Sequence, residues 1–201
     1  MSDRRGSFRR ASKETEITAV WDLDTPGGDG DVATGIGMLD HLVSQLSRHG
    51  RFTIELRAHG DLHIDAHHTV EDCAIVLGRA LDDALGERRG IVRMAHAIVP
   101  LDEALAMVAL DLGGRGYAVL DLPFRGEMMG QLPTELVCHF LETLAREARM
   151  SLHVRLMAGQ IDHHRAEATF KALARALDEA TRIDPRIAEE VPSTKGIIDR
   201  A

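Results

Sequence analysis

An internal repeat restricts the fold of this chain more than any other feature of its sequence. The segment HHTVEDCAIVLGRALDDAL begins at His67, and HHRAEATFKALARALDEAT begins at His163, an offset of 96 residues. Each copy opens with His-His-x-x-Glu, and RALD recurs at Arg79–Asp82 and Arg175–Asp178. A duplicated chain is expected to fold as two similar units that bury their apolar faces together.

The repeat extends upstream of the paired histidines. His41 in LDHLVSQLSRHGRFTIELR precedes His139 in LVCHFLETLAREARMSLHVR by 98 residues, which indicates a two-residue deletion between the blocks. Still further upstream, KETEITAVWDLD resembles LDEALAMVALDL and brings Glu14 close to the position of Glu103. We therefore expect one compact catalytic unit with three parts: a flexible arm (1–12), a first half-repeat (13–88) and a second half-repeat (89–201).

Hydrophobic periodicity predicts the same kinds of element in both halves. Alternating apolar residues indicate strands with one buried face, and apolar residues at helical spacing indicate amphipathic helices. The predicted strands lie at Ile17–Trp21, Phe52–Leu56 and Met150–Val154, the predicted helices at Leu39–Arg48 and after His67 and His163, and the predicted loops at Asp24–Gly35 and Asp121–Thr134. The sequence thus predicts an α+β fold of two duplicated halves, each a sheet packed on helices.

Composition narrows the classes of partner. The chain has 201 residues, is 44% hydrophobic and has a net charge of −8, with only 3% aromatic residues. Because nucleic-acid binding needs clustered cations and a membrane span needs roughly 20 apolar residues in a row, we expect neither partner. Cys73 and Cys138 lie in apolar-periodic segments, which favours buried thiols in a reducing, cytoplasmic location.

The paired histidines indicate a metal centre. Imidazole and carboxylate are ligands for divalent transition metals, and Glu71 follows His67 and His68 by four and three residues, so either pair can share a helix face. His67 and His68 themselves point about 100° apart and cannot easily bind one ion together. We therefore expect two ions, each bound by one histidine from each pair.

The expected ligands are six histidines and two glutamates: His41, His67, His68, Glu71, His139, His163, His164 and Glu167. Four protein ligands per ion leave two positions of an octahedron open, which favours Mn²⁺ or Fe²⁺ over a closed zinc site. The neighbouring acids Asp65, Asp72 and Asp162 are expected to orient the imidazoles. His59, His63, His96 and His153 are expected to be surface histidines or histidines with satisfied hydrogen bonds, whereas Gln45 and His49 extend a helical stripe from His41.

A second group of residues is cationic. VPSTKG (Val191–Gly196) offers a hydroxyl, backbone N–H groups and Lys195 in a short turn, a combination that suits a phosphate group. LGGRGY (Leu112–Tyr117) places Arg115 between glycines, where backbone can approach a ligand closely. Arg93 and Lys171 are further candidates, although a lone cation is more often a solvated surface charge.

At these motifs the chain resembles the imidazoleglycerol-phosphate dehydratase family of histidine biosynthesis, in its monofunctional form. The resemblance spans nearly the whole chain, through TGIGMLDHLVSQLSRHG, GDLHIDAHHTVEDCAIVLGRAL, VPLDEALAMVALDLGGR, TELVCHFLETLA, DHHRAEATFKALARAL and VPSTKG, in that order. It implies a duplicated fold similar to the second domain of ribosomal protein S5, two Mn²⁺ per active site, a phosphorylated imidazole substrate, and 24-mers with active sites between subunits.

The resemblance also implies residue roles and a mechanism. The catalytic candidates are Glu14, Glu71 and Glu167, and the substrate-binding candidates are Glu14, His41, Gln45, His49, Arg93, Arg115, Lys171, Ser193 and Lys195. We expect a metal-bound imidazolate intermediate, because the proton to be removed lies on a carbon with no neighbouring carbonyl. The chain departs from the family pattern at Arg115-Gly116, commonly Arg-Pro, and at Arg93-Met94-Ala95, commonly Arg-Phe-Gly.

Two other functions fit the histidine and glutamate pattern. One is a di-metal hydrolase that activates water. The other is a non-catalytic metal-binding or storage assembly, since symmetric oligomers with helix-borne ligands suit that role. A storage protein has no reason to bind a small phosphomonoester, so the cationic group argues against it.

Overall fold

The chain folds into two halves with the same order of elements. The computed structural model describes residues 4–26, 28 and 30–198. The first half contains β1 (Arg5–Ala11), β2 (Thr15–Asp22), β3 (Asp31–Ala33), α1 (Gly37–Gly50), β4 (Thr53–Gly60) and α2 (His67–Leu85). The second contains β5 (Met94–Leu101), β6 (Ala104–Asp111), β7 (Tyr117–Asp121), α3 (Thr134–Glu147), β10 (Ser151–Ala158) and α4 (Asp162–Thr181), with the hairpin β8 (Met128–Met129) and β9 (Leu132–Pro133) inserted before α3.

Sheet topology confirms the α+β fold of duplicated halves. The first sheet has the order β1-β2-β4-β3, and the second has the corresponding order β5-β6-β10-β7. In each sheet the last strand pairs parallel with its neighbour and the other pairs are antiparallel. Element for element, β1 therefore corresponds to β5, β2 to β6, α1 to α3 and α2 to α4.

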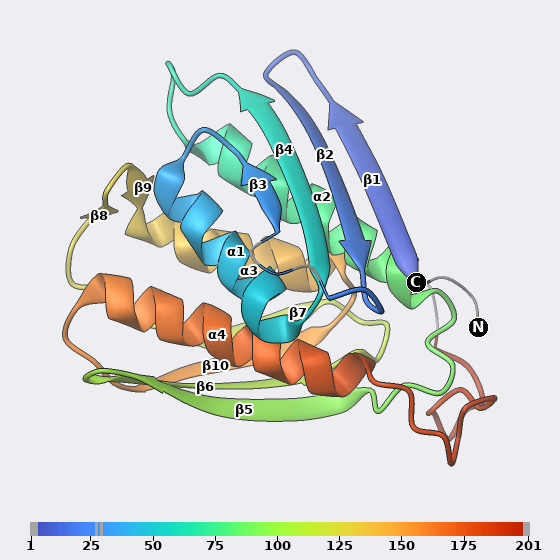
Figure 1. Ribbon diagram of the computed structural model, residues 1–201. Helices are drawn as coiled ribbons and strands as arrows, with labels where there is room; N and C mark the ends of the chain where they lie inside the picture. The colour runs from blue at the N-terminus through green and yellow to red at the C-terminus, as the bar shows by residue number, and fades with distance from the viewer. Residues whose placement is uncertain (1–3, 27, 29, 199–201) are drawn as a thin grey trace.

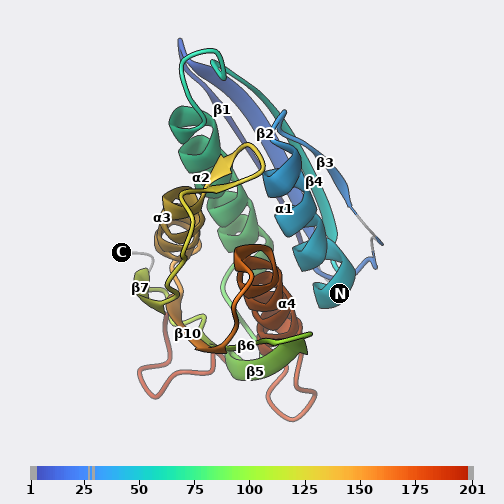
Figure 2. The ribbon, with the colours of Figure 1, turned by 90° about the vertical axis from the view of Figure 1, so that its left-hand side faces the viewer.

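The helices lie between the two sheets (Figures 1 and 2). Helix α2 packs on β1 and β2, and α4 packs on β5 and β6. Across the middle of the molecule, α1 of the first half packs on α4 of the second, and α2 packs on α3. All four helices begin at the same end, the left in Figure 1 and the near end in Figure 2.

Buried apolar residues from both halves form one continuous core. The predicted alternation is observed in β2, where Ile17, Ala19 and Trp21 are buried, because every second strand residue faces the helices. Trp21 contacts Phe52 with ring centroids 5.7 Å apart. Cys73 is fully buried and Cys138 partly, whereas the four histidines expected to be surface or hydrogen-bonded ones, His59, His63, His96 and His153, are exposed.

The expectation of a flexible arm at the start was wrong for Arg5–Ala11. These residues form the edge strand β1, which pairs with β2 over its whole length, while residues 1–3 lie outside the described part of the chain. The strand was not recognised in the sequence because its exposed side chains include several arginines. Charged side chains are common on edge strands, where they prevent pairing with another chain. Arg9 forms an ion pair with Glu16 on the neighbouring strand at 2.7 Å. The predicted loops also contain short strands, β3 in one and β8–β9 in the other.

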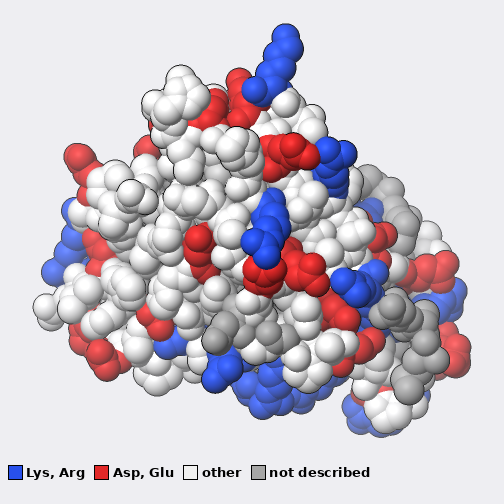
Figure 3. Space-filling model, turned by 45° about the horizontal axis from the view of Figure 1, so that its top comes forward, with Lys and Arg blue, Asp and Glu red and all other residues white. Residues whose placement is uncertain are grey.

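Figure 3 shows acidic and basic side chains interspersed among uncharged ones over the face turned to the viewer. None of the helices in the described part of the chain has the length and apolar character that crossing a lipid bilayer requires.

We predict that Gly6→Ala destabilises the fold by about 1–3 kcal/mol, because a Cβ at this buried position would lie 2.1 Å from the carbonyl oxygen of Ala80 in α2. The added methyl forces β1 away from α2. Ser7→Ala, at the exposed neighbouring position, should change stability by less than about 0.5 kcal/mol. The denaturant midpoints of the two variants provide the comparison, and equal midpoints would contradict the close strand–helix contact.

Candidate metal centre

The first set of metal-ligand side chains lies where α1 meets α4. His41, His163 and Glu167 place one ligand atom each within 4.8 Å of one another. Oε2 of Glu167 lies 3.0 Å from Nε2 of both His41 and His163, and the two imidazoles stack with centroids 5.3 Å apart. His163 and Glu167 share a face of α4 because they are four residues apart.

The second set lies where α2 meets α3, and it is the counterpart of the first. His67, Glu71 and His139 again place their ligand atoms within 4.8 Å of one another. Nε2 of His139 lies 3.6 Å from Glu71 Oε1, and the His67 and His139 rings are 4.9 Å apart. This nitrogen is buried and has no hydrogen-bond partner among the described residues, which leaves a lone pair or proton unsatisfied.

Each set combines residues of both halves. Within one chain the structure groups His67 with His139, and His163 with His41. The reason is helix packing: α2 lies against α3 and α4 against α1, so each His-His helix meets the upstream helix of the other half. The expected ligands His41, His67, Glu71, His139, His163 and Glu167 are thus brought together in two groups of three. That each ion also takes one histidine from each pair stays a prediction.

The other histidine of each pair, His68 or His164, belongs to neither set. Each ring is turned by 82° from its neighbour in sequence. Nδ1 of His68 lies 3.0 Å from Asp61 Oδ2, and Nδ1 of His164 lies 2.7 Å from Glu103 Oε2. These contacts raise the pKa of both histidines.

The acids expected to orient imidazoles have other partners. Asp65 accepts a hydrogen bond from the backbone N–H of His67 at 2.7 Å, and Asp72 binds Arg10 and Thr15. Asp162 accepts from the backbone N–H groups of residues 125 and 126. Sequence adjacency was the wrong guide, because an acid beside a helical residue points in a different direction around the helix axis. Asp61 and Glu103 were missed, although the alignment of Glu103 with Glu14 contained a signal.

A lysine makes the first set electrostatically different from the second. Burial raises the pKa of Glu167, but the Lys171 ammonium, 2.7 Å from Oε1, and the His41 ring outweigh it and lower the pKa to about 2. The predicted phosphate binder Lys171 is therefore engaged at the metal-ligand end. About two turns beyond His41 along α1, burial and the nearby Lys171 charge lower the pKa of His49. Gln45 donates a hydrogen bond to the His41 carbonyl at 3.4 Å.

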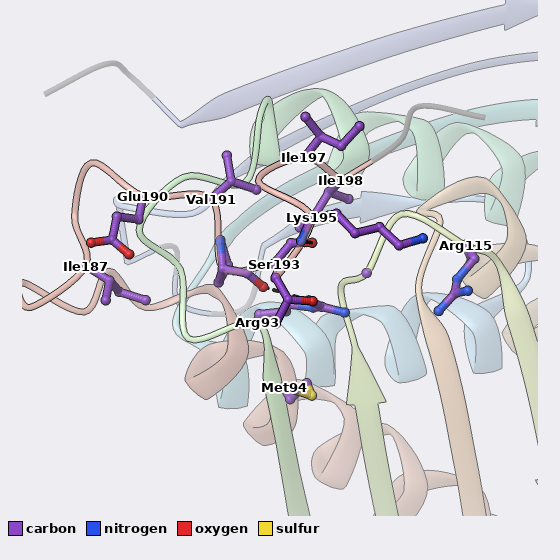
Figure 4. Close-up of a pocket in the computed structure, with 13 residues that line it drawn as sticks. Arg93, Met94, Arg115, Ile187, Glu190, Val191, Ser193, Lys195, Ile197 and Ile198 are labelled. Carbon is purple, nitrogen blue, oxygen red and sulfur yellow. Dashed lines mark hydrogen bonds between the residues drawn. The ribbon is translucent and has the colours of Figure 1, made fainter.

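A cavity of about 630 Å³ brings together four of the predicted phosphate binders, Arg93, Arg115, Ser193 and Lys195. Lys195 donates its backbone N–H to the hydroxyl of Ser193 at 3.2 Å within a tight turn. Figure 4 shows the Lys195 side chain extending toward Arg115 across the cavity. Neither of these two cations has an acidic partner among the ion pairs of the described residues, so both are available to an anion.

Arg93 has a different place in this cavity. Its guanidinium binds both oxygens of Asp111, at 2.7 and 3.0 Å, and donates to the Pro192 carbonyl at 2.6 Å. Arg93 therefore ties the C-terminal turn to β6. At the departure from the family pattern, a Cβ on Gly116 would lie 2.5 Å from the backbone of Arg146, so glycine here lets the Arg115 loop approach α3 closely.

The cavity and the ligand sets lie at opposite ends of the molecule. Both sets form where the helices begin, whereas the cavity follows the last residues of α4, to which Arg93 is tied by a backbone hydrogen bond to the Ala180 carbonyl. Figure 1 shows the C-terminal segment, in red, on the side away from the helix starts. Helix α4 has 20 residues, and at about 1.5 Å per residue it separates the two places by roughly 30 Å.

Comparisons with known proteins place these features in a family. The family model described as imidazoleglycerol-phosphate dehydratase matches residues 34–177. A protein of that name from Chloroflexus aurantiacus is 54% identical over 97% of this chain and 95% of its own, and one from Dehalococcoides mccartyi is 54% identical over 99% and 100%. Crystal structures of this dehydratase from Staphylococcus aureus and Pyrococcus furiosus have TM-scores of 0.81 and 0.80, with 30% and 33% identity; they cover 90% and 94% of this chain, and the matches span 99% of each of those chains.

We predict that Lys171→Met makes the metal-free protein less sensitive to acid. Because the folded pKa of Glu167 is about 2, below the ordinary value of 4.5, the ionised carboxylate stabilises the fold above pH 4.5, and this stabilisation is lost as pH falls from about 4.5 to about 2. Without the ammonium, the folded pKa moves toward 4.5 and the effect shrinks. Urea unfolding at about pH 6 and about pH 3 measures the difference. Lys195→Met should lose stability with acid as the native protein does; an equal loss in Lys171→Met would contradict the assignment.

Proposed function

The chain belongs to the imidazoleglycerol-phosphate dehydratase family, and from this premise we propose that its two ligand sets hold two Mn²⁺ ions required for the reaction. As a member of this family, the protein is a hydro-lyase that removes water from imidazoleglycerol phosphate in histidine biosynthesis. The observation that carries the metal proposal is the convergence of two matching His₂Glu sets from distant parts of the chain.

The donor chemistry of both sets fits the proposed ions. Two imidazole nitrogens and a carboxylate oxygen per set leave positions for another ligand and for substrate around an octahedral ion. The buried, unpartnered Nε2 of His139 is an atom that a metal would satisfy. When bound, Mn²⁺ would supply Lewis-acid stabilisation of negative charge on the substrate ring.

The protein's own acids carry the proton transfer in this proposal. Glu14 lies in the turn between β1 and β2, half-exposed, with Oε2 3.9 Å from Nδ1 of His68. It is therefore close to the metal-ligand end yet free of an ion pair with lysine or arginine among the described residues, as a proton acceptor should be. Glu71 and Glu167 lie inside the sets, and Lys171 keeps Glu167 ionised as a ligand.

The cavity at the other end is the proposed phosphate site. Lys195, Arg115 and the Ser193 hydroxyl provide two cations and a donor around one space of about 630 Å³. Arg93 contributes by holding the turn that carries Ser193 and Lys195. This cavity distinguishes the protein from a metal-storage assembly, and its distance from the ligand sets bears on how a complete site is built.

A complete active site therefore needs more than one chain. The substrate is a three-carbon chain between an imidazole and a phosphate, about 10 Å long from ordinary bond lengths, and cannot span roughly 30 Å within one molecule. We propose that the phosphate cavity of one chain faces the ligand sets of another. His68 and His164, which belong to neither set, then complete the sets of neighbouring chains, which restores four protein ligands per ion. A closed 24-mer and a cytoplasmic location stay predictions of the family resemblance.

We predict that chelation abolishes dehydration of imidazoleglycerol phosphate and that added Mn²⁺ restores it. The expected reason is loss of the charge stabilisation that the ions supply. Product formation is measured in three samples: untreated protein, protein after chelation and removal of the chelator, and the chelated protein after addition of Mn²⁺. Addition of Mg²⁺ is the control, because histidine-rich sites bind Mg²⁺ poorly. Full activity in protein shown by elemental analysis to contain no transition metal would contradict the proposal.

We also predict that two inactive variants restore activity when they are mixed. His41→Ala damages a ligand set and Lys195→Ala damages the phosphate cavity, so each is inactive alone. If a site combines the ligand sets of one chain with the cavity of another, about one quarter of the sites are intact after equal amounts are dissociated and reassembled together.

The matched control mixes His41→Ala with His163→Ala, which lie in the same set and cannot complement in this way. Activity in the first mixture and none in the second supports a site shared between chains. Absence of activity in both mixtures, with reassembly verified by size, would contradict it.

A further inference from the structure

The two hairpins at the metal-ligand end contain duplicated glutamates with different surroundings. Glu14 lies in the turn between β1 and β2, and Glu103 lies in the corresponding turn between β5 and β6. Each turn lies beside the His-His helix of its own half, so Glu14 is near His68 and Glu103 is near His164. The shared topology makes these residues structural equivalents, and their contacts can be compared directly.

Glu103 is fixed on both sides of its carboxylate. Oε1 accepts hydrogen bonds from the backbone N–H groups of Gln160 and Ile161 at 3.0 and 2.8 Å, just before α4 begins. Oε2 lies 2.7 Å from Nδ1 of His164. Both oxygens are therefore engaged, and the imidazole is held in one orientation relative to the helix that carries it.

In the first half, the carboxylate within hydrogen-bonding distance of Nδ1 of the corresponding histidine comes from an aspartate and not from Glu14. Asp61, at the end of β4, places Oδ2 3.0 Å from Nδ1 of His68, whereas Glu14 stays at 3.9 Å and is more exposed. Oδ1 of Asp61 is buried without a hydrogen-bond partner among the described residues. Among the residues that the structure describes, the imidazole of His68 is the hydrogen-bond partner of this carboxylate, through the acceptor oxygen Oδ2.

We propose that Asp61 and Glu103 are positioning residues that hold His68 and His164 with Nδ1–H toward the carboxylate and Nε2 available to a metal ion, and that Asp61 thereby releases Glu14 from this role. Oδ2 of Asp102 lies 3.8 Å from Nε2 of His164, beyond hydrogen-bonding distance. The inference rests on the proposed metal function. A neutral imidazole has one N–H and one lone pair, so donation from Nδ1 to a carboxylate places the lone pair on Nε2. Carboxylates in this arrangement fix the orientation and increase the basicity of metal-binding histidines.

The two duplicated glutamates therefore have different roles: Glu103 positions a histidine, and Glu14 can accept a proton. Both oxygens of Glu103 already accept hydrogen bonds, from His164 and from two backbone N–H groups, which lowers its pKa to about 2 and makes it a weak proton acceptor. Glu14 makes only a 3.9 Å contact with His68, because Asp61 holds that histidine. The two ends of the pseudo-symmetric centre are therefore chemically unequal: one has an exposed glutamate that can accept a proton, and the other has a glutamate fixed by hydrogen bonds.

The test is the affinity of the metal-stripped, full-length protein for Mn²⁺ alone, measured by equilibrium dialysis. Asp61→Leu should weaken Mn²⁺ binding by about 10- to 100-fold, the usual effect of losing such a carboxylate. Asp61→Asn should weaken it less, because the amide oxygen can still accept the N–H but carries no charge. Glu103→Leu and Glu103→Gln should follow the same order. Glu142→Gln, an exposed charge removal on α3, is the matched control and should leave affinity unchanged.

A second comparison separates positioning from a general structural effect. In a His68→Ala background, Asp61→Leu should cause no further loss of Mn²⁺ affinity, because the carboxylate acts through that ring. An equal loss in both backgrounds overturns the proposal, as does native affinity in Asp61→Leu. If the leucine variant does not fold, native affinity in Asp61→Asn overturns it instead. Unaltered protein that binds no Mn²⁺ overturns the proposed metal function itself, whereas binding that is insensitive to these substitutions overturns only the positioning role.

Discussion

The contact between helices of different halves is the interaction on which the rest of the site depends. Neither half contains a complete ligand set, so His41 and His139 reach their partners only because α1 packs on α4 and α2 packs on α3. Glycine permits the close approach in one of these pairs: a Cβ at Gly78 in α2 would lie 2.6 Å from Glu147 at the end of α3. The apolar core that joins the halves therefore determines the distances between ligand atoms as well as the stability of the fold.

The candidate cation-binding and anion-binding groups lie at opposite ends of the helices. At the end where the helices begin, carboxylates and imidazoles gather around places suited to cations. At the far end, Arg115, Lys195 and the turn held by Arg93 gather around a place suited to an anion. A substrate with an imidazole at one end and a phosphate at the other matches this separation of charge only when chains lie against one another. Under the proposed function, a site is complete only after chains associate.

The duplication allowed much of this to be predicted from the sequence, and its limits are physical. Periodicity located α1, α2, α4, β2, β4 and β10, because each buries one face and leaves the other polar. The repeat also predicted the six candidate ligands that the structure brings together. It did not predict their grouping within one chain, because that grouping depends on which helices pack together across the halves. The orienting acids were missed for a related reason: Asp61 and Glu103 reach the imidazoles from a strand end and a hairpin, at positions that spacing along a helix does not reveal.

Lys171 should give the two otherwise matching ligand sets different affinities for a divalent cation. Its ammonium lies 2.7 Å from Glu167, whereas the ion pairs that Glu71 forms among the described residues involve only histidines. An incoming divalent cation must either share Glu167 with Lys171 or displace it, and a like charge at this distance weakens binding. The set around Glu71 should accordingly fill first. If the two sets hold ions as proposed, scarce metal in a cell would leave chains with one set filled, and the supply of the second ion would decide how many sites operate.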